Sequence, residues 1–313
     1  MPSWSDVEVS TPIDVAEVFS LLDAAHDADG VRPLSEEAEL RLRHGGPPGG
    51  QDVVLRDGDA LAAYARYDVD GDTDGDTASA ELVVHPAFRR RGFGGALLDR
   101  LVELAGERVL HVWAHGDLPG STELLSSRGF SRSRVLLQMR RDLAGVEADP
   151  RPELPDGVRI VPFRTGRDED AWLRVNARAF AHHPEQGRMS RTDLDLREQE
   201  AWFDPDGFLM AWRGDPAGGG TLLGFHWTKV HPPGDAADEA VGEIYVLGVA
   251  PDAQGMRLGR ALTDLGLAHL RARGLGEVLL YVEEENEAAV RLYESRGFRR
   301  FAVDVQWRHA SRP

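Results

Sequence analysis

The 313-residue sequence contains no cysteine. Disulfide bonds, thiolate nucleophiles, iron–sulfur clusters and Cys-ligated zinc are therefore excluded. Other residue types are scarce: Lys229 is the single lysine among 36 basic residues, and only three isoleucines and two asparagines occur. This bias toward Ala, Arg, Gly and Asp is typical of a GC-rich genome, and it makes each rare residue worth locating in the chain.

Positive charge is also scarce. The chain has 53 acidic residues against 36 basic ones, which gives a formal net charge of −17. Such acidity disfavours a nucleic-acid partner, whose binding depends on the neutralisation of phosphates. Runs of 18 or more apolar residues are absent, so no transmembrane helix is predicted. Met1–Val9 lacks the basic start of a signal peptide. We therefore expect a cytoplasmic monomer without nucleic-acid or membrane partners.

The strongest feature that is present is a long internal repeat. Residues 82–97 and 247–262 share an apolar stretch, a proline turn, a loop with arginine and glycine, and an Ala-Leu pair. Further along each half, Ser127–Phe130 recurs as Ser295–Phe298. Two landmarks that recur in the same order, with nearly the same separation between their copies, predict a tandem of two similar domains.

The repeat sets the expected domain boundaries. We expect a first domain at residues 1–141, a linker at 142–157 and a second domain at 158–313. The linker segment contains several prolines and many acids, with little apolar pattern. Hydrophobic residues make up 42% of the chain, enough for each domain to bury a core.

Apolar periodicity and helix caps predict the elements of each domain. The expected strands of the second domain lie at 158–163, 208–212, 222–229, 244–249, 278–282 and 301–307. Its expected helices lie at 168–181, 193–202, 258–273 and 287–295. The first domain is expected to repeat this order, with helices near 13–25 and 35–43 and a loop at 45–50.

The loop between strand and helix at Arg89–Gly94 carries the clearest chemical signal. Its glycines let the backbone approach a ligand closely. The N–H groups and dipole of the following helix favour an anion there. We interpret the loop as a pyrophosphate cradle, and its occurrence in both halves of the chain favours this over an arginine-rich surface turn.

These loops resemble a known family. Arg89-x-x-Gly92-x-Gly94 fits the Arg/Gln-x-x-Gly-x-Gly/Ala acetyl-CoA signature of the GNAT N-acetyltransferase superfamily. Gln254-x-x-Arg257-x-Gly259 fits it with one departure, because Arg257 replaces the first glycine. The stretch Asn286–Phe298 resembles the second CoA-side motif of the superfamily. The resemblance implies the fold class: α/β (α+β in stricter schemes), with two tandem GNAT domains, each a mixed, mainly antiparallel sheet flanked by helices.

The resemblance also implies one or two acetyl-CoA sites, without a metal ion. In the first domain the implied cofactor-binding residues are Leu82, Val83, Val84, Arg89, Arg90, Arg91, Gly92, Phe93, Gly94 and Gly95. In the second domain they are Leu247, Gly248, Val249, Gln254, Gly255, Met256, Arg257, Leu258, Gly259, Arg260, Asn286 and Arg291.

The tandem arrangement is similar to the mycothiol synthase family of actinobacteria. The stretches His183–Gly187 and Ile244–Val249 carry this closer resemblance. It implies transfer of an acetyl group from acetyl-CoA to the cysteinyl amine of cysteinyl-glucosaminyl-inositol, the last step of mycothiol synthesis. The partner would be a small-molecule amine that also carries a thiol.

Amine acetylation needs a base for the ammonium proton and an acid for the leaving thiolate. It also needs an N–H donor for the oxyanion. Aligning the halves pairs Tyr293 with Leu125 and Glu243 with Ala78. We therefore hypothesise that the second domain catalyses, with Glu243 as base and Tyr293 as acid. The first domain would keep a cofactor site without turnover, and a backbone N–H of 247–249 would polarise the thioester carbonyl.

The family resemblance implies five substrate contacts: Glu36, Glu185, Lys229, Glu243 and Tyr281. The residues themselves support two of them. A sole lysine at a strand end can donate to the hydroxyls of a sugar or inositol ring. Tyr281 lies near the end of a buried strand, where ligand sites of α/β proteins occur.

Two alternatives stay open. The chain could be a tandem GNAT enzyme for another amine, such as an aminoglycoside, a polyamine or a protein N-terminus. It could instead be a non-catalytic acetyl-CoA-binding module.

A separate match, from Asp70 to Glu81, fits a calcium-loop pattern. Its flanks look like strands rather than helices, so we interpret it as an acidic hairpin loop.

Overall fold

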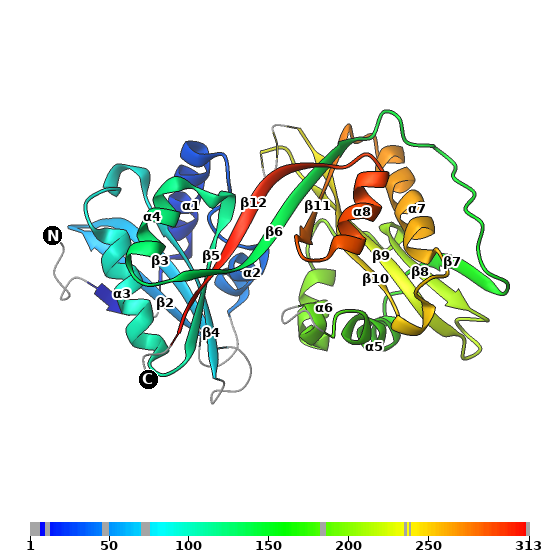
Figure 1. Cartoon of the computed structure of the whole chain (residues 1–313), viewed down its shortest axis with the longest axis horizontal. Helices are drawn as coiled ribbons and strands as arrows, with labels where there is room; N and C mark the ends of the chain where they lie inside the picture. The colour runs from blue at the N-terminus through cyan, green and yellow to red at the C-terminus, as the bar shows by residue number, and fades with distance from the viewer. Residues whose placement is uncertain are drawn as a thin grey trace. The chain divides into compact units, whose positions relative to one another are not determined.

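The computed structural model describes residues 7–9, 13–45, 50–69, 76–181, 186–234, 237 and 239–310 (Figure 1). Its contacts divide the chain into two compact units. Unit 1 comprises Met1–Leu137, Glu283–Asn286 and Ala302–Pro313. Unit 2 comprises Gln138–Val282 and Glu287–Phe301. The C-terminal residues 302–313 thus belong to the first unit, although the sequence assigned them to the second domain.

Unit 1 is a sheet with helices on both faces. Its strand order is β1-β2-β3-β4-β5-β12-β6. The strands are β1 (Val7–Val9), β2 (Gln51–Asp57), β3 (Ala60–Val69), β4 (Thr77–Val84), β5 (Val109–Ala114), and parts of β6 (Ser131–Asp142) and β12 (Arg299–His309). The helices are α1 (Val15–Asp29), α2 (Glu36–His44), α3 (Phe93–Ala105) and α4 (Pro119–Ser127).

Strand alternation explains these two layers. Val53 and Leu55 of β2 are buried in the core that α3 covers. Val54, between them, is buried in a second core with α1 and α2. Because successive side chains of a strand point to opposite faces, one apolar run supplies both cores. The helices begin at side-chain caps: Asp14 accepts from the first N–H groups of α1, and Ser35 accepts from Ala38 in α2.

Unit 2 repeats this plan. Its strand order is β6-β11-β10-β9-β8-β7. The strands are β7 (Val158–Pro162), β8 (Phe208–Arg213), β9 (Thr221–His231), β10 (Val241–Val249) and β11 (Glu277–Glu283), with the end of β6. The helices are α5 (Glu169–Ala179), α6 (Arg191–Glu198), α7 (Leu258–Ala272) and α8 (Glu287–Ser295).

The two faces of β9 meet different helices. The Trp172 ring of α5 lies 5.4 Å from Phe225 and 5.6 Å from Trp227, between ring centroids. His226 turns the other way, with its Nδ1 2.7 Å from the carbonyl oxygen of Leu262 in α7. From Phe225 onward, odd-numbered residues of β9 therefore face α5, and even-numbered ones face α7.

The predicted fold class is confirmed. In each unit one strand pair is parallel, β4 with β5 and β10 with β11, and the other resolved pairs are antiparallel. The expected helices and strands of the second half are present, with ends shifted by a few residues. In the described part of the chain, no helix combines the length and the apolar character that a membrane crossing needs.

The strand beside each parallel pair comes from the other half of the sequence. In unit 1, β12 pairs antiparallel with β5, from Val305↔Ala114 to His309↔Leu110. In unit 2, β6 is the neighbour of β11. The strand expected at 301–307 is confirmed, but it completes unit 1. Both halves end in similar strands, so their sequence pattern does not distinguish these pairings.

The segment that follows β6 packs on unit 2. Leu143 and Val146 are buried, and the Leu143 N–H donates to the Gly276 carbonyl oxygen at 2.9 Å. Arg271 of α7 also donates to the Val146 carbonyl oxygen. The first residues of the expected linker are therefore an ordered part of unit 2, because they bury apolar side chains.

Candidate active site

The loops before α3 and α7 share one backbone conformation. Arg90 (φ 60°) and Gly92 (φ 95°) are left-handed in unit 1. Their counterparts Gly255 (φ 82°) and Arg257 (φ 60°) are left-handed in unit 2. Gly92 and Arg257 are the N-caps, and neither helix start receives a side-chain cap. The first N–H groups of a helix lack intrahelical acceptors, so both loops suit an anionic ligand.

A glycine near each helix start faces the end of the preceding strand and a second helix. A Cβ added at Gly94 would lie 3.4 Å from Val84 at the end of β4 and 3.2 Å from Leu124 of α4. A Cβ added at Gly259 would lie 3.9 Å from Val249 at the end of β10 and 3.8 Å from Leu292 of α8. The predicted strand ends, loops and helices therefore meet in the same way in both units, and they fit the phosphates of a nucleotide cofactor.

The arginine side chains of the first loop are paired with carboxylates. Arg89 forms a two-point ion pair with Asp29, with both N···O distances 2.7 Å. Arg90 pairs with Glu123 at 2.8 Å, and Arg91 pairs with Asp57 at 2.7 Å. An anionic ligand at this loop would therefore depend mainly on backbone N–H groups rather than on these guanidinium groups.

The left-handed arginine in unit 2 gives a prediction about stability. We expect Arg257→Gly to raise the free energy of unfolding by about 0.5–1 kcal/mol. A left-handed backbone costs a non-glycine residue roughly 1–2 kcal/mol, and the larger conformational entropy that glycine loses on folding offsets part of the gain. Urea unfolding measures the change. Arg260→Gly is the control, since Arg260 lies within α7 and should lose about 1 kcal/mol. Destabilisation by both variants contradicts the prediction.

The parallel strands of unit 2 separate beside a β-bulge. β10 pairs with β11 from Gly242↔Val278 to Ile244↔Leu280, and the pairing ends there. The register of β10 against β9 shifts between Ile244 and Val246, which leaves Tyr245 as an extra residue. Beyond this point, alternate N–H groups of β10 face the gap that β11 has left. The donor role expected for a backbone N–H of residues 247–249 stays a prediction that this gap allows.

The parallel strands of unit 1 stay paired for longer. β4 pairs with β5 as far as Glu81↔Trp113, and the resolved β3–β4 register has no shift. When the repeated Ser-Arg-Gly-Phe landmarks are aligned, Trp113 corresponds to Tyr281, which lies just past the last β10–β11 pair. The gap in unit 1 therefore begins later than the gap in unit 2.

The bulge corrects one alignment of the two halves. Leu279 is the partner of Glu243 on β11, and the same landmark alignment pairs Leu279 with His111 of β5. His111 pairs with Ser79. The structural counterpart of Glu243 is therefore Ser79, and the alignment with Ala78 was wrong because Tyr245 adds one residue to β10. The contrast between the units remains, since Ser79 is not a carboxylate.

Glu243 is buried on β10 and forms a short contact with a histidine. Its Oε2 lies 2.7 Å from Nε2 of His231. Lys229 is its direct partner on β9. The neighbouring Gly242 faces α7, because a Cβ there would lie 2.9 Å from Leu270. Glu243, Lys229 and His231 therefore share the opposite face of the sheet, the one that α5 covers.

Aromatic rings surround the lysine. The Nζ of Lys229 lies 4.8 Å from the centroid of Trp202 and 5.5 Å from that of Tyr245. The Tyr245 hydroxyl accepts from Nε of Arg197 at 2.7 Å. Lys229 is buried, and the rings stabilise its positive charge there. The only lysine of the chain is thus held beside Glu243.

Sequence reasoning missed His231, Trp202 and Tyr245 as site residues. His231 could have been found, because it follows Lys229 at the two-residue spacing of one strand face. Trp202 lies in the loop after α6, and Tyr245 occupies the bulge. Neither position has a periodicity that would indicate the site.

Tyr293 is buried on α8, with its ring 5.7 Å from Phe298. Burial raises the pKa of its hydroxyl, which keeps this group protonated at neutral pH. Its counterpart in unit 1, Leu125, is also buried. Among the contacts of the described residues, none joins Tyr293 to Glu243. Leu292 beside Gly259 places α8 against the start of α7.

The remaining predicted residues are dispersed. Tyr281 of β11 is exposed, and its hydroxyl accepts from Nε2 of Gln138 at 2.6 Å. Asn286 precedes α8 and is exposed, and Arg291 pairs with Glu287 at 2.8 Å. Glu36 is the first residue of α2 in unit 1. Glu185 lies outside the described residues.

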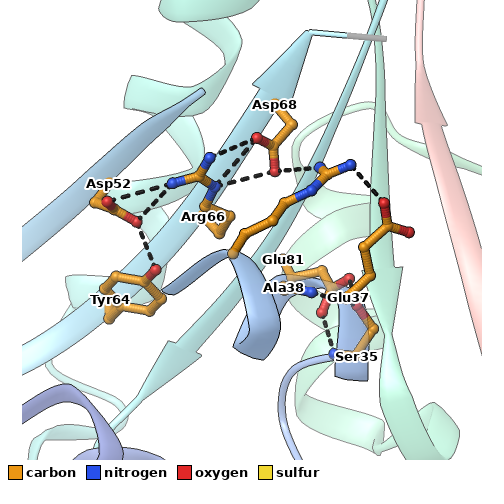
Figure 2. Close-up of polar contacts among 9 residues, drawn as sticks. Ser35, Glu37, Ala38, Asp52, Tyr64, Arg66, Asp68 and Glu81 are labelled. Atoms are coloured by element: carbon orange, nitrogen blue, oxygen red, sulfur yellow. Dashed lines mark hydrogen bonds and ion pairs between the residues drawn. The ribbon is translucent and has the colours of Figure 1, made fainter. Parts of the chain in front are cut away.

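Ion pairs anchor α2, the helix that begins with Glu36. Arg41 of α2 contacts Asp68 of β3 at 2.9 Å and Glu37 at 2.5 Å. Figure 2 shows Asp68 bonded in turn to Arg66, which also reaches Asp52. Through Arg41, this network holds the last turn of α2 on the sheet of unit 1.

In unit 1, a carboxylate occupies the position of Val246. Glu81 accepts from the backbone N–H and the hydroxyl of Ser35, at 2.5 and 2.6 Å (Figure 2). His115 lies 3.4 Å from Glu81 and 3.3 Å from Asp304. Burial lowers the pKa of His115, but Asp304 and Glu81 raise it further, to about 10. The imidazolium therefore joins two buried carboxylates beside the strand gap.

The structure describes only the flanks of the calcium-like pattern. Residues 70–75 lie outside the described part of the chain, as do His182 and His183. Both flanks are strands, β3 and β4, as predicted. Glu81, the last residue of the pattern, is engaged by Ser35 and His115. Within the described residues, no group of three or more His, Asp or Glu side chains is arranged to hold a metal ion.

Comparisons with known proteins agree with this geometry. The model of the acetyltransferase (GNAT) family matches residues 16–130 and 176–298. A tandem GNAT protein from the clavulanic acid biosynthesis pathway has the same fold, with a TM-score of 0.73 at 21% identity, and 98% of this chain and 99% of that chain are covered. The chain is therefore a GNAT acetyltransferase with two units, as the resemblance predicted.

Curated relatives identify the particular family. The mycothiol acetyltransferase of Geodermatophilus obscurus is 64% identical over 310 residues, covering 99% of this chain and 98% of the relative. The mycothiol acetyltransferase of Thermobispora bispora is 54% identical, covering 95% of this chain and 97% of the relative. Within the GNAT acetyltransferases, the chain belongs to the mycothiol acetyltransferase family.

Proposed function

We propose that this enzyme transfers an acetyl group from acetyl-CoA to the cysteinyl amine of cysteinyl-glucosaminyl-inositol, which completes mycothiol. The names of its full-length relatives support this assignment. The observation that carries it is the gap between β10 and β11, which has Glu243 and Lys229 at one end and the loop of α7 at the other.

In unit 2, we infer that the loop 254–260 and the strand end 247–249 bind acetyl-CoA, together with Asn286 and Arg291. The cofactor supplies the acetyl thioester when it is bound. Left-handed Gly255 and Arg257 support phosphate binding by the loop, because they turn backbone N–H groups toward one spot. A free N–H of β10 would hold the carbonyl oxygen of the thioester.

Two side chains move protons in the proposed reaction. Glu243 accepts the proton of the attacking ammonium through a water molecule, and its contact with His231 fixes the orientation of the carboxylate. Tyr293 donates a proton to the leaving sulfur. Its raised pKa supports this role, since the hydroxyl carries its proton throughout the neutral range.

The proposed substrate contacts are Glu36, Glu185, Lys229, Glu243 and Tyr281. The buried ammonium of Lys229, held between aromatic rings, is a donor suited to a hydroxyl of the acceptor. This observation favours cysteinyl-glucosaminyl-inositol over a polyamine.

Unit 1 is proposed to bind acetyl-CoA without turnover. Its loop and its strand end 82–84 are built like those of unit 2. It has Ser79 and Leu125 in place of the base and the acid. Its strand gap starts later, and Glu81 there is bonded to Ser35 and His115. The occupation of this second site, the monomeric state and the cytoplasmic location stay predictions.

A panel of amines tests the proposed function. Acetyl-CoA consumption is followed with cysteinyl-glucosaminyl-inositol, spermidine and an aminoglycoside as acceptors. We expect turnover with the first acceptor at least about 100-fold above the others, because the site hydrogen-bonds hydroxyls. Turnover with spermidine alone overturns the substrate assignment. Binding of acetyl-CoA without turnover of any acceptor indicates a non-catalytic module.

A further inference from the structure

Two large apolar side chains are exposed in the described part of the chain, and both lie in unit 2. Tyr281 of β11 is 42% exposed and Phe301 of β12 is 62% exposed. A folded protein leaves a lone apolar residue exposed often, but two aromatic rings on one small surface commonly mark a binding site.

Polar side chains of β6 connect the two rings. Gln138 donates to the Tyr281 hydroxyl at 2.6 Å, and Arg140 donates to Gln138 at 3.1 Å. The guanidinium carbon of Arg140 lies 3.8 Å from the centroid of Phe301. Glu277 holds the far side of Arg140 at 2.9 Å. The four residues Gln138, Arg140, Tyr281 and Phe301 thus form one continuous surface, which we name the aromatic platform.

The aromatic platform lies on the same face of the sheet as Glu243. Glu243 is the register partner of Leu279, and Tyr281 follows Leu279 by two residues on β11. Side chains two residues apart on a strand point to the same face. Tyr281 therefore lies roughly 7 Å further along β11 than the partner of the proposed base.

The platform extends away from Glu243 across three strands. The sheet order from β10 is β11, then β6, then β12. Neighbouring strands are about 4.8 Å apart, so Phe301 lies on the order of 14 Å from β10 across the sheet. Lys229 is on β9, on the other side of Glu243. An acceptor whose amine lies at Glu243 reaches the platform only if it is considerably longer than an amino acid.

The chemistry of the platform selects the kind of group that it can hold. The faces of Tyr281 and Phe301 suit the C–H face of a saturated ring. The amide of Gln138 and the guanidinium of Arg140 lie beside the rings and carry N–H donors, the kind of group from which hydroxyl oxygens accept. These features together fit a neutral, polyhydroxylated ring.

We propose that the aromatic platform binds the polyhydroxylated end of the acceptor and that Phe301 and Arg140 determine specificity for it. This inference rests on the proposed function, because it assumes that the amine end of the same acceptor reaches Glu243. The platform then explains how one site recognises both ends of an extended molecule.

Acceptors of different length test the platform. We compare cysteinyl-glucosaminyl-inositol with cysteinamide, which has the amine but no ring. We expect Phe301→Ala to raise the KM for the full acceptor about tenfold more than the KM for cysteinamide, which is the effect of losing one aromatic face. Phe301→Trp should restore the KM for the full acceptor. Arg300→Ala is the matched control, because Arg300 is exposed on the same strand but points to the opposite face.

The outcomes separate the two proposals. If the wild-type enzyme acetylates the full acceptor and Phe301→Ala changes both KM values equally, the platform is wrong and the proposed function stands. If the wild-type enzyme acetylates cysteinamide but prefers no ring-bearing acceptor, both proposals fail. Calorimetric titration of the enzyme with glucosaminyl-inositol, which lacks the cysteinyl amine, measures binding to the platform in the absence of turnover. Binding by the wild-type enzyme that Phe301→Ala weakens supports the platform, and equal binding by both overturns it.

Discussion

Glu243→Gln should lower kcat by about 10²–10⁴-fold, the contribution of a positioned general base. Glutamine keeps the size of the side chain and its hydrogen-bonding contact with His231, but it cannot accept the proton of the ammonium. Steady-state kinetics with the full acceptor measures the loss. The dissociation constant for acetyl-CoA should stay within about twofold, because Glu243 lies on β10 before the bulge and the loop lies after it.

Two further variants test the proposed acid and provide a control for that result. Tyr293→Phe should also lower kcat, and its residual activity should respond to the thiol acidity of the leaving group, since the acid is then missing. Glu294→Gln is the matched control: it changes an exposed carboxylate next to Tyr293 on α8 and should behave as wild type. Full activity of Glu243→Gln would show that another group takes the proton, and the base would have to be sought elsewhere in the gap.

The conformation of the loops before α3 and α7 was predictable from the sequence because it depends on local chemistry. Glycine and arginine occupy the two left-handed positions of each loop, in opposite order: Arg90 with Gly92, and Gly255 with Arg257. One glycine in each loop was enough to indicate a tight turn before a helix. The departure at Arg257 therefore preserves the backbone conformation of the loop in unit 2.

The arrangement around Glu243 was only partly predictable. A lone lysine and a carboxylate at strand ends indicated a site, but the pairing of Lys229 with Glu243 depends on the register of β9 against β10. That register includes a bulge at Tyr245, and no local sequence signal shows where an extra residue will be accommodated. The same bulge made the alignment of Glu243 with Ala78 wrong by one position.

The exchange of strands between the halves could not be predicted from either half alone. β6 and β12 both follow a Ser-Arg-Gly-Phe landmark, so each fits beside β5 or β11 by its pattern. Only tertiary packing decides between these partners. Val305 and Trp307 of β12 are buried with β5 and α3, which shows that the core of unit 1 depends on the C-terminal strand.

His115 should contribute strongly to the stability of unit 1. It lies between the buried carboxylates of Glu81 and Asp304, and the Asp304 carboxylate also accepts from the Gly116 N–H at 2.7 Å. We expect His115→Leu to lower the free energy of unfolding at pH 7 by about 3–5 kcal/mol, because it leaves two buried carboxylates without their shared cation. Urea unfolding measures the change, and His44→Leu, which alters an exposed histidine of the same unit, should change stability by less than about 0.5 kcal/mol.

The pH dependence identifies the cause. In the folded protein, burial lowers the pKa of His115 but the two carboxylates raise it to about 10, against an ordinary value of 6.5. The charged imidazole therefore stabilises the fold fully below pH 6.5, and this stabilisation is lost as the pH rises toward 10. The difference in stability between wild type and His115→Leu should be largest near pH 6 and should shrink steadily up to pH 10. A difference that stays constant over this range would mean that His115 acts through packing rather than through its charge, since a lost apolar contact does not titrate.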